Sequence, residues 1–156
     1  MKNILLSALA LAALLLSCDK EDHSPDLSGN DYLIFGHFYG FCQGEECVRT
    51  FKLTADKLYE DQNDNYMGQA DSDFAELSQE RFERVKHLPG LLPAELLQAE
   101  SQTFGCPDCA DQGGLYIEHA QDGEVRTWII DSDKSAVPEY LHHFMDEVRA
   151  AITEAG

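Results

Sequence analysis

The sequence predicts one α+β domain, in which an antiparallel sheet carries its helices on one face. Two stretches rich in aromatic and β-branched residues indicate β-hairpins, and the last segment of the chain has apolar residues at helical spacing. A hairpin pairs its strands antiparallel, and an amphipathic helix must bury its apolar stripe against another element. We therefore expect residues 31–156 to fold as a single globular domain, a length that buries a core without help from metal or disulfides.

The first predicted hairpin has arms at residues 32–39 and 48–53, which are aromatic and β-branched runs. Cys42 and Cys47 flank the four residues between them, so these two cysteines can face each other across the loop. In that register the paired residues are Phe41 with Val48 and Phe38 with Phe51.

Shorter elements follow this hairpin. A turn at residues 54–56 leads into a third strand over 57–60 and then into a polar loop over 61–73. Apolar residues at helical spacing next predict a short helix, for which Ser78 is the N-cap candidate. Pro89-Gly90 ends that helix, and a second short helix is expected after Pro93.

The clearest hairpin spans residues 115–130, because Asp122-Gly123 supplies the two positive-φ residues that a type I′ turn requires. A two-residue turn also fixes which residues face each other on the two arms. The predicted pairs are Leu115 with Ile130, Tyr116 with Ile129, Ile117 with Trp128, and Ala120 with Val125.

The last element is a helix with a narrow apolar stripe. The stripe residues are Val137, Leu141, Phe144, Met145, Val148 and Ile152. His143 points away from this stripe and His142 lies on its flank, so we interpret the two histidines as solvent-side residues and not as a metal pair. The helix is expected to pack on the sheet.

The N-terminal residues indicate export. Lys2, a short apolar run over residues 4–16 and the small residue Ser17 form a signal peptide that is too short to span a bilayer as a helix. Leu15-Leu16-Ser17-Cys18 resembles the lipobox of bacterial lipoproteins, although Leu16 is bulkier than usual. The resemblance implies that residues 1–17 are removed and that Cys18 becomes the acylated first residue; a plain secretory signal is the alternative.

The tether over residues 18–30 carries a second resemblance. Asp19-Lys20-Glu21-Asp22 is similar to the export tag that follows the acylated cysteine in lipoproteins of Bacteroidota type. This similarity implies display on the outer surface of the outer membrane, with a periplasm-facing anchor or a merely solvated acidic tether as alternatives. The region after the tether also resembles the small, uncharacterised lipoproteins of such bacteria, which implies a location and a general architecture but no catalytic residues.

Charge narrows the choice of partners. Removal of residues 1–17 takes away Lys2 and leaves 10 basic against 29 acidic side chains, a formal charge of −19. An acidic surface repels phosphate backbones and anionic headgroups, so nucleic acid is not expected as a partner. The membrane is expected to be reached through the lipid anchor.

Four further cysteines leave three interpretations open: Cys42 and Cys47, and Cys106 and Cys109. Disulfides are favoured because an exported protein passes through an oxidising compartment, but the sequence does not decide between local and crossed pairs. A four-thiolate zinc site is the runner-up and the one cofactor considered. Thiol redox chemistry at Cys106-Pro107-Asp108-Cys109 is third, because Asp108 and Asp111 disfavour a thiolate.

Other catalytic motifs are weak. Asp61-Gln62-Asn63-Asp64-Asn65 begins like a calcium loop, but Tyr66 and Ser72 occupy the positions where an EF-hand needs Gly and Glu. No nucleophile elbow, phosphate loop or zinc-protease motif occurs in the chain.

The expected function is that of a non-catalytic, lipid-anchored envelope protein that binds a protein or glycan through tyrosine, phenylalanine and acidic residues. The alternatives are an envelope thiol-disulfide oxidoreductase and a zinc-stabilised module.

Overall fold

A computed structural model of the chain describes residues 27–42, 47–63, 72–107, 109 and 111–156. The predicted signal peptide, the predicted acylation site Cys18 and most of the predicted tether lie outside the described residues. So does most of the loop that begins like a calcium site.

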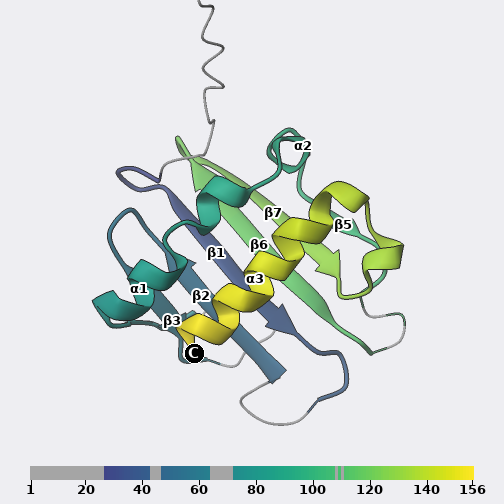
Figure 1. The fold of residues 1–156 in the computed structure, drawn as a ribbon, viewed down its shortest axis with the longest axis horizontal. Coiled ribbons are helices and arrows are strands. Elements are labelled where there is room, and N and C mark those ends of the chain that lie inside the picture. Colours follow the sequence, from purple (N-terminus) through teal and green to yellow (C-terminus); the bar gives the residue numbers. More distant parts are fainter. Residues whose placement is uncertain (1–26, 43–46, 64–71, 108, 110) are drawn as a thin grey trace, which may run out of the picture.

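The described residues form one seven-stranded sheet in the order β4-β3-β2-β1-β6-β7-β5 (Figure 1). Every neighbouring pair is antiparallel except β5 and β7, which are parallel. The strands are β1 (Tyr32–Phe38), β2 (Val48–Leu53), β3 (Leu58–Asp61), β4 (Phe74–Glu76), β5 (Gln102–Phe104), β6 (Gly114–Gln121) and β7 (Glu124–Asp131). The central strand β1 is therefore hydrogen-bonded along both of its edges.

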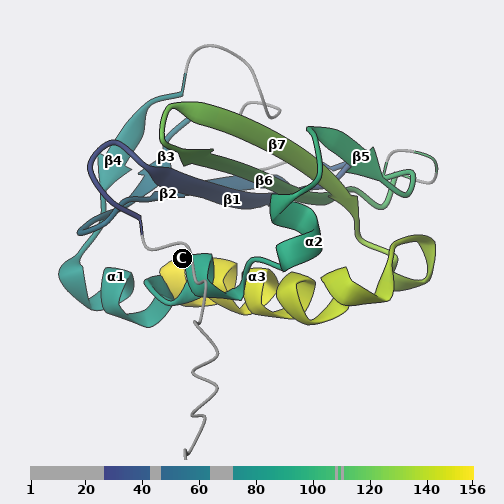
Figure 2. The ribbon, with the colours of Figure 1, turned by 90° about the horizontal axis from the view of Figure 1, so that it is seen from above.

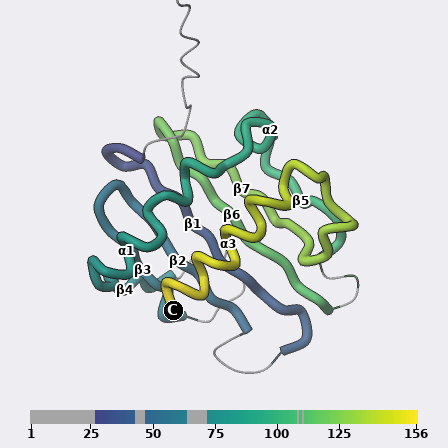
Figure 3. The backbone as a smooth tube through the Cα atoms, in the orientation of Figure 1, coloured from purple at the N-terminus to yellow at the C-terminus, as the bar shows by residue number. Residues whose placement is uncertain are grey.

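All described helices lie on one face of this sheet (Figure 2). They are α1 (Gln79–Val85), η2 (Leu88–Leu91), α2 (Ala94–Leu97), η3 (Lys134–Ala136), η4 (Glu139–Leu141) and α3 (His142–Ala155). The segment holding α1, η2 and α2 carries the chain from one edge of the sheet to the other, and α3 lies across the same face (Figure 3). We call the opposite face of the sheet the outer face.

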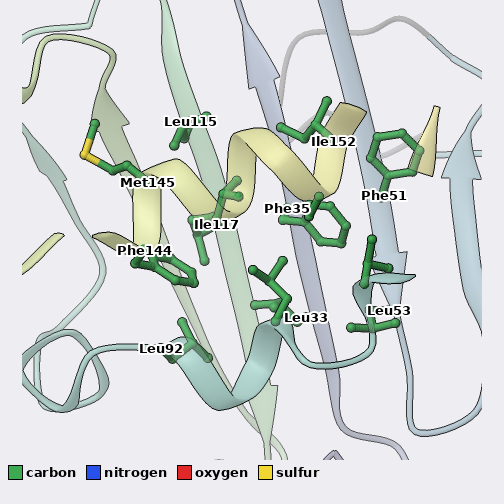
Figure 4. Close-up of a cluster of buried hydrophobic side chains, with 14 of the residues drawn as sticks. Leu33, Phe35, Phe51, Leu53, Leu92, Leu115, Ile117, Phe144, Met145 and Ile152 are labelled. Atoms are coloured by element: carbon green, nitrogen blue, oxygen red, sulfur yellow. The ribbon is translucent and has the colours of Figure 1, made fainter. Parts of the chain in front are cut away.

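The core fills the space between the sheet and the helices (Figure 4). Alternate residues of β1 and β2, including Leu33, Phe35 and Phe51, point toward α3, as the two-residue period of a strand requires. Trp128 in β7 is also fully buried, and its indole N–H donates to the carbonyl oxygen of Glu100. The α+β class predicted from the sequence is thus confirmed.

Several local predictions are also confirmed. All four pairs predicted for the second hairpin occur, and Asp122 and Gly123 have φ values of 53° and 84°. The Ser78 side chain caps α1 by accepting a hydrogen bond from the backbone N–H of Arg81. In the C-terminal segment all six stripe residues are buried, and two of them, Val137 and Leu141, precede α3.

The register predicted for the first hairpin is wrong by three residues. Phe38, and not Phe41, faces Val48, and Phe35, and not Phe38, faces Phe51. This register gives Phe35 and Phe51 to the core and leaves Phe41 87% exposed in the loop. A shift by an odd number of residues turns every side chain of a strand to the opposite face of the sheet. The observed register therefore follows from the burial of Phe35 and Phe51 in the core and not from the shortest loop that the cysteines allow.

The predicted sheet of two hairpins and one short strand is also corrected, since the sheet is mixed. The sequence did not indicate β4 or β5, which are three residues each and too short for an alternating pattern. The helical segment after β4 delivers β5 to the far edge of the sheet beside β7. The chain then runs through β6, which is antiparallel to β7, before it reaches β7, and β5 and β7 are therefore not joined by a hairpin and pair in parallel.

Candidate functional site

The outer face carries a hydrogen-bonded group of two tyrosines and one carboxylate. The hydroxyl of Tyr32 donates to Oε1 of Glu118 over 2.8 Å, and the hydroxyl of Tyr116 donates to Oε2 of the same residue over 2.7 Å. We call these three residues the tyrosine–glutamate cluster. Tyr116 is buried and forms the base of the cluster, whereas Tyr32 and Glu118 are partly exposed and form its accessible rim.

The pairing of β1 with β6 builds this cluster. Tyr116 and Glu118 are two residues apart in β6 and therefore lie on one face, while Leu115 and Ile117 point into the core. Tyr116 lies opposite Gly36. A Cβ atom at Gly36 would collide with the backbone carbonyl of Arg49 in β2, so this position requires glycine.

A cation lies beside the cluster. The ammonium nitrogen of Lys52 is 4.4 Å from the ring centroid of Tyr32 and 5.7 Å from that of Phe74. Contacts of this length to an aromatic face attract a cation through the quadrupole of the ring. The rim therefore already accommodates positive charge at the Tyr32 ring.

Both hydroxyl groups of the cluster keep their protons across the physiological pH range. Burial raises the pKa of Tyr32 to about 12, and its hydrogen bond to Glu118 acts in the same direction. Burial raises the pKa of Tyr116 as well, again with support from Glu118. The two phenols are consequently permanent donors to the carboxylate.

The described cysteines form two local disulfides, Cys42–Cys47 and Cys106–Cys109, with Cα–Cα distances of 5.5 and 5.4 Å. The crossed pairing that the sequence left open does not occur. Phe38 at the end of β1 pairs with Gly114 at the start of β6, so both disulfide loops lie at the same end of the sheet. No group of three or more His, Cys, Asp or Glu side chains in the described ranges is arranged to hold a metal ion.

Asp131 holds the second disulfide loop in place. It is 1% exposed, and its carboxylate accepts hydrogen bonds from the backbone N–H of Cys106, the side-chain amide of Gln112 and the backbone N–H of Asp133. The carboxylate lies beside the Cys106 backbone, and the loop leads into a strand and not into a helix N-terminus. Neither feature favours a thiolate.

The two adjacent histidines are not placed together as ligands. His143 has a side chain that is 75% exposed, whereas Nε2 of His142 lies 2.8 Å from the carbonyl oxygen of Lys134. His142 thus fastens the start of α3 to the preceding turn. The interpretation of His143 as a solvent-side residue is confirmed, and His142 has a structural contact.

His119 is a buried titratable residue that sequence reasoning missed. It is 4% exposed, and its Nε2 has no hydrogen-bond partner among the described residues. Burial lowers its pKa, and Arg126 acts in the same direction, while Asp31 opposes the shift. The folded protein therefore disfavours the charged imidazolium at this position.

We expect this histidine to make the fold less stable in mild acid. Its pKa is below 6.5 in the folded state and about 6.5 in the unfolded chain, so below pH 6.5 the unfolded chain binds a proton that the folded chain does not. The free energy of unfolding should fall as the pH drops from 7 toward the folded-state pKa. Urea unfolding of wild type and His119→Leu between pH 7.5 and 5 measures this.

His143→Gln is the matched control, because its imidazole is exposed. The slope of stability against pH should become shallower in His119→Leu and stay as in wild type in His143→Gln. Equal slopes in all three proteins would contradict the assignment. The carboxyl of Asp31 affects stability at a lower pH. Its pKa is held below 3.8, mainly by the backbone N–H of Asp122. Its contribution to the free energy of unfolding is therefore present above pH 3.8 and is lost as the pH falls through the folded-state pKa.

The tyrosine–glutamate cluster was also missed by sequence reasoning, which named tyrosines and acidic residues only as a class. The alternation of Tyr116 and Glu118 in a predicted strand was the available signal. Tyr32 joins them from 86 positions away, and only the pairing of β1 with β6 brings it there.

Comparison with known proteins found no matching family model and no significant match among curated proteins. In the described part of the chain, no helix has the length and apolar character needed to cross a bilayer.

Proposed function

We propose that this protein is a lipid-anchored component of the cell envelope, displayed at the outer membrane surface, that binds a macromolecular partner without catalysing a reaction. Cys18 is the proposed site of acylation, and the outer face is the proposed binding surface. The observation that carries the proposal is the tyrosine–glutamate cluster on a sheet face that no described helix covers.

The chemistry of the outer face supports binding. Tyrosine supplies a large contact area at low cost in side-chain entropy, and it is enriched at protein interfaces. The Glu118 carboxylate holds both phenol hydroxyls, so part of the ordering cost is met before a partner arrives.

The way the tether enters the fold supports an anchored role. Asp31 accepts hydrogen bonds from the backbone and hydroxyl of Ser28 and from the backbone N–H of Asp122, which fastens the chain to the β6–β7 turn. The chain then continues into β1, the central strand. A force on the tether is therefore passed to the strand with neighbours on both sides.

A photo-crosslinking amino acid at Val125 tests the proposed surface. Val125 is 50% exposed and lies on the outer face opposite Ala120, whereas Ala150 is exposed on α3 and provides the control position. On intact cells we expect a discrete crosslinked species from Val125 that is absent from Ala150. Equal products from both positions, or none from Val125, would overturn the proposal.

A further inference from the structure

We propose that the tyrosine–glutamate cluster receives a lysine or arginine side chain from a basic segment of the partner protein. This inference rests on the proposed function, because it uses the outer face as the interface. It specifies the chemistry of the partner.

The hydrogen bonds of the cluster set the first requirement. Both phenol protons are already donated to Glu118, so Tyr32 and Glu118 present mainly unused oxygen lone pairs at the exposed rim. A ligand group that binds there must donate hydrogen bonds. Ammonium and guanidinium groups donate three and five N–H bonds and accept none.

The rings set the second requirement. The ammonium group of Lys52 already lies within cation–π distance of the rings of Tyr32 and Phe74, which shows that this part of the face is suited to a cation. A carboxylate and aromatic faces beside each other favour a positively charged group over a neutral one. Arginine can bridge them, since its planar guanidinium stacks on rings and pairs with carboxylates.

The charge of the whole chain sets the third requirement. A formal charge of −19 after removal of residues 1–17 attracts basic segments and repels acidic ones, so it raises the encounter rate with a basic partner. An anionic glycan is repelled by this negative charge. A neutral glycan is neither attracted nor repelled, and it is therefore the main competing ligand.

Binding of a fluorescent, acetylated peptide with three arginines separated by glycines tests the inference, measured by anisotropy on the full mature protein in detergent. Glu118→Gln should weaken binding about tenfold, because it removes the charge that pairs with the donor. Glu154→Gln makes the same charge change at an exposed site on α3, across the sheet from the cluster, and should change the affinity less than twofold. Thermal melting of both variants verifies folding.

Lys52→Met gives a second, independent test. It removes the cation that competes for the Tyr32 ring, so affinity for the arginine peptide should rise about threefold. Weaker binding by Lys52→Met would overturn the inference, because it would show that Lys52 contacts the ligand.

Three other results would also overturn it: no binding of the peptide, equal weakening by Glu118→Gln and Glu154→Gln, or binding of a neutral oligosaccharide in its place. These results are separable from failure of the proposed function. A Val125 crosslink without peptide binding would remove the basic ligand and leave the surface, whereas loss of the crosslink would remove the surface itself.

Discussion

Asp131→Ala is expected to lower the free energy of unfolding by about 3 kcal/mol, because it strips a buried acceptor from several donors at once. The carboxylate accepts from the backbone N–H groups of Cys106 and Asp133 and from the side chain of Gln112 over 2.7 to 2.9 Å. A buried donor that loses its partner costs about 1 to 3 kcal/mol, and the side chain of Gln112 can turn to water. Urea unfolding at pH 7 with the disulfides intact measures the loss.

Two variants separate this role from a general effect of losing an aspartate. Asp131→Asn keeps one acceptor oxygen and should recover part of the stability. Asp133→Ala removes only the cap of the short helix η3, where the exposed carboxylate accepts from the Ser135 N–H, and should cost clearly less than Asp131→Ala. Equal losses in Asp131→Ala and Asp133→Ala would contradict the assignment, as would an unchanged hydrogen-exchange rate at the Cys106 amide in Asp131→Ala.

The two hairpins show what the sequence can and cannot predict. The second hairpin is specified locally, because Asp122-Gly123 adopts the positive φ values of its turn and leaves one register for the arms. The sequence between the arms of the first hairpin has no Asn-Gly or Asp-Gly pair. Its cysteines bond across a longer loop, while burial of Phe35 and Phe51 decides the register. The spacing of Cys42 and Cys47 therefore indicated the disulfide but not the pairing of the strands.

The candidate site was less predictable than the fold for a related reason. Tyr116 and Glu118 are visible as neighbours on one strand face, but a third member arrives only through long-range pairing. The position of β6 beside β1 depends on the order of strands in the whole sheet. The edge strand β5 illustrates the same limit, since three residues reach their place only through the crossover that precedes them.

The proposed anchor and the proposed binding surface meet on one pair of strands. The tether acts on β1, which the sheet holds on both edges, while the cluster joins β1 to β6 on the outer face. Tension on the proposed tether and binding at the cluster would therefore act on the same strand pair. The hydrogen bonds from Ser28 and Asp122 to Asp31 lie where the tether joins this pair.

The largest expected effect is that of Cys18→Ser, which should remove the protein from the membrane fraction completely. A serine has no thiol to carry the acyl chains that we propose for this position. Each buried methylene contributes about 0.8 kcal/mol, and two or more acyl chains give stable anchoring where one gives only marginal binding. Labelling with a fatty acid, followed by separation of membrane and soluble fractions, measures both steps.

The double variant Cys42→Ser/Cys47→Ser is the matched control, because it removes two thiols and leaves Cys18. It should keep the fatty-acid label and stay with the membrane, although loss of the loop disulfide should lower its stability by about 2 kcal/mol. The intact mass of the wild-type protein should correspond to a chain that begins at Cys18 and carries acyl groups. A label that persists in Cys18→Ser, or a wild-type mass that still includes residues 1–17, would show that the chain is held at the envelope in another way.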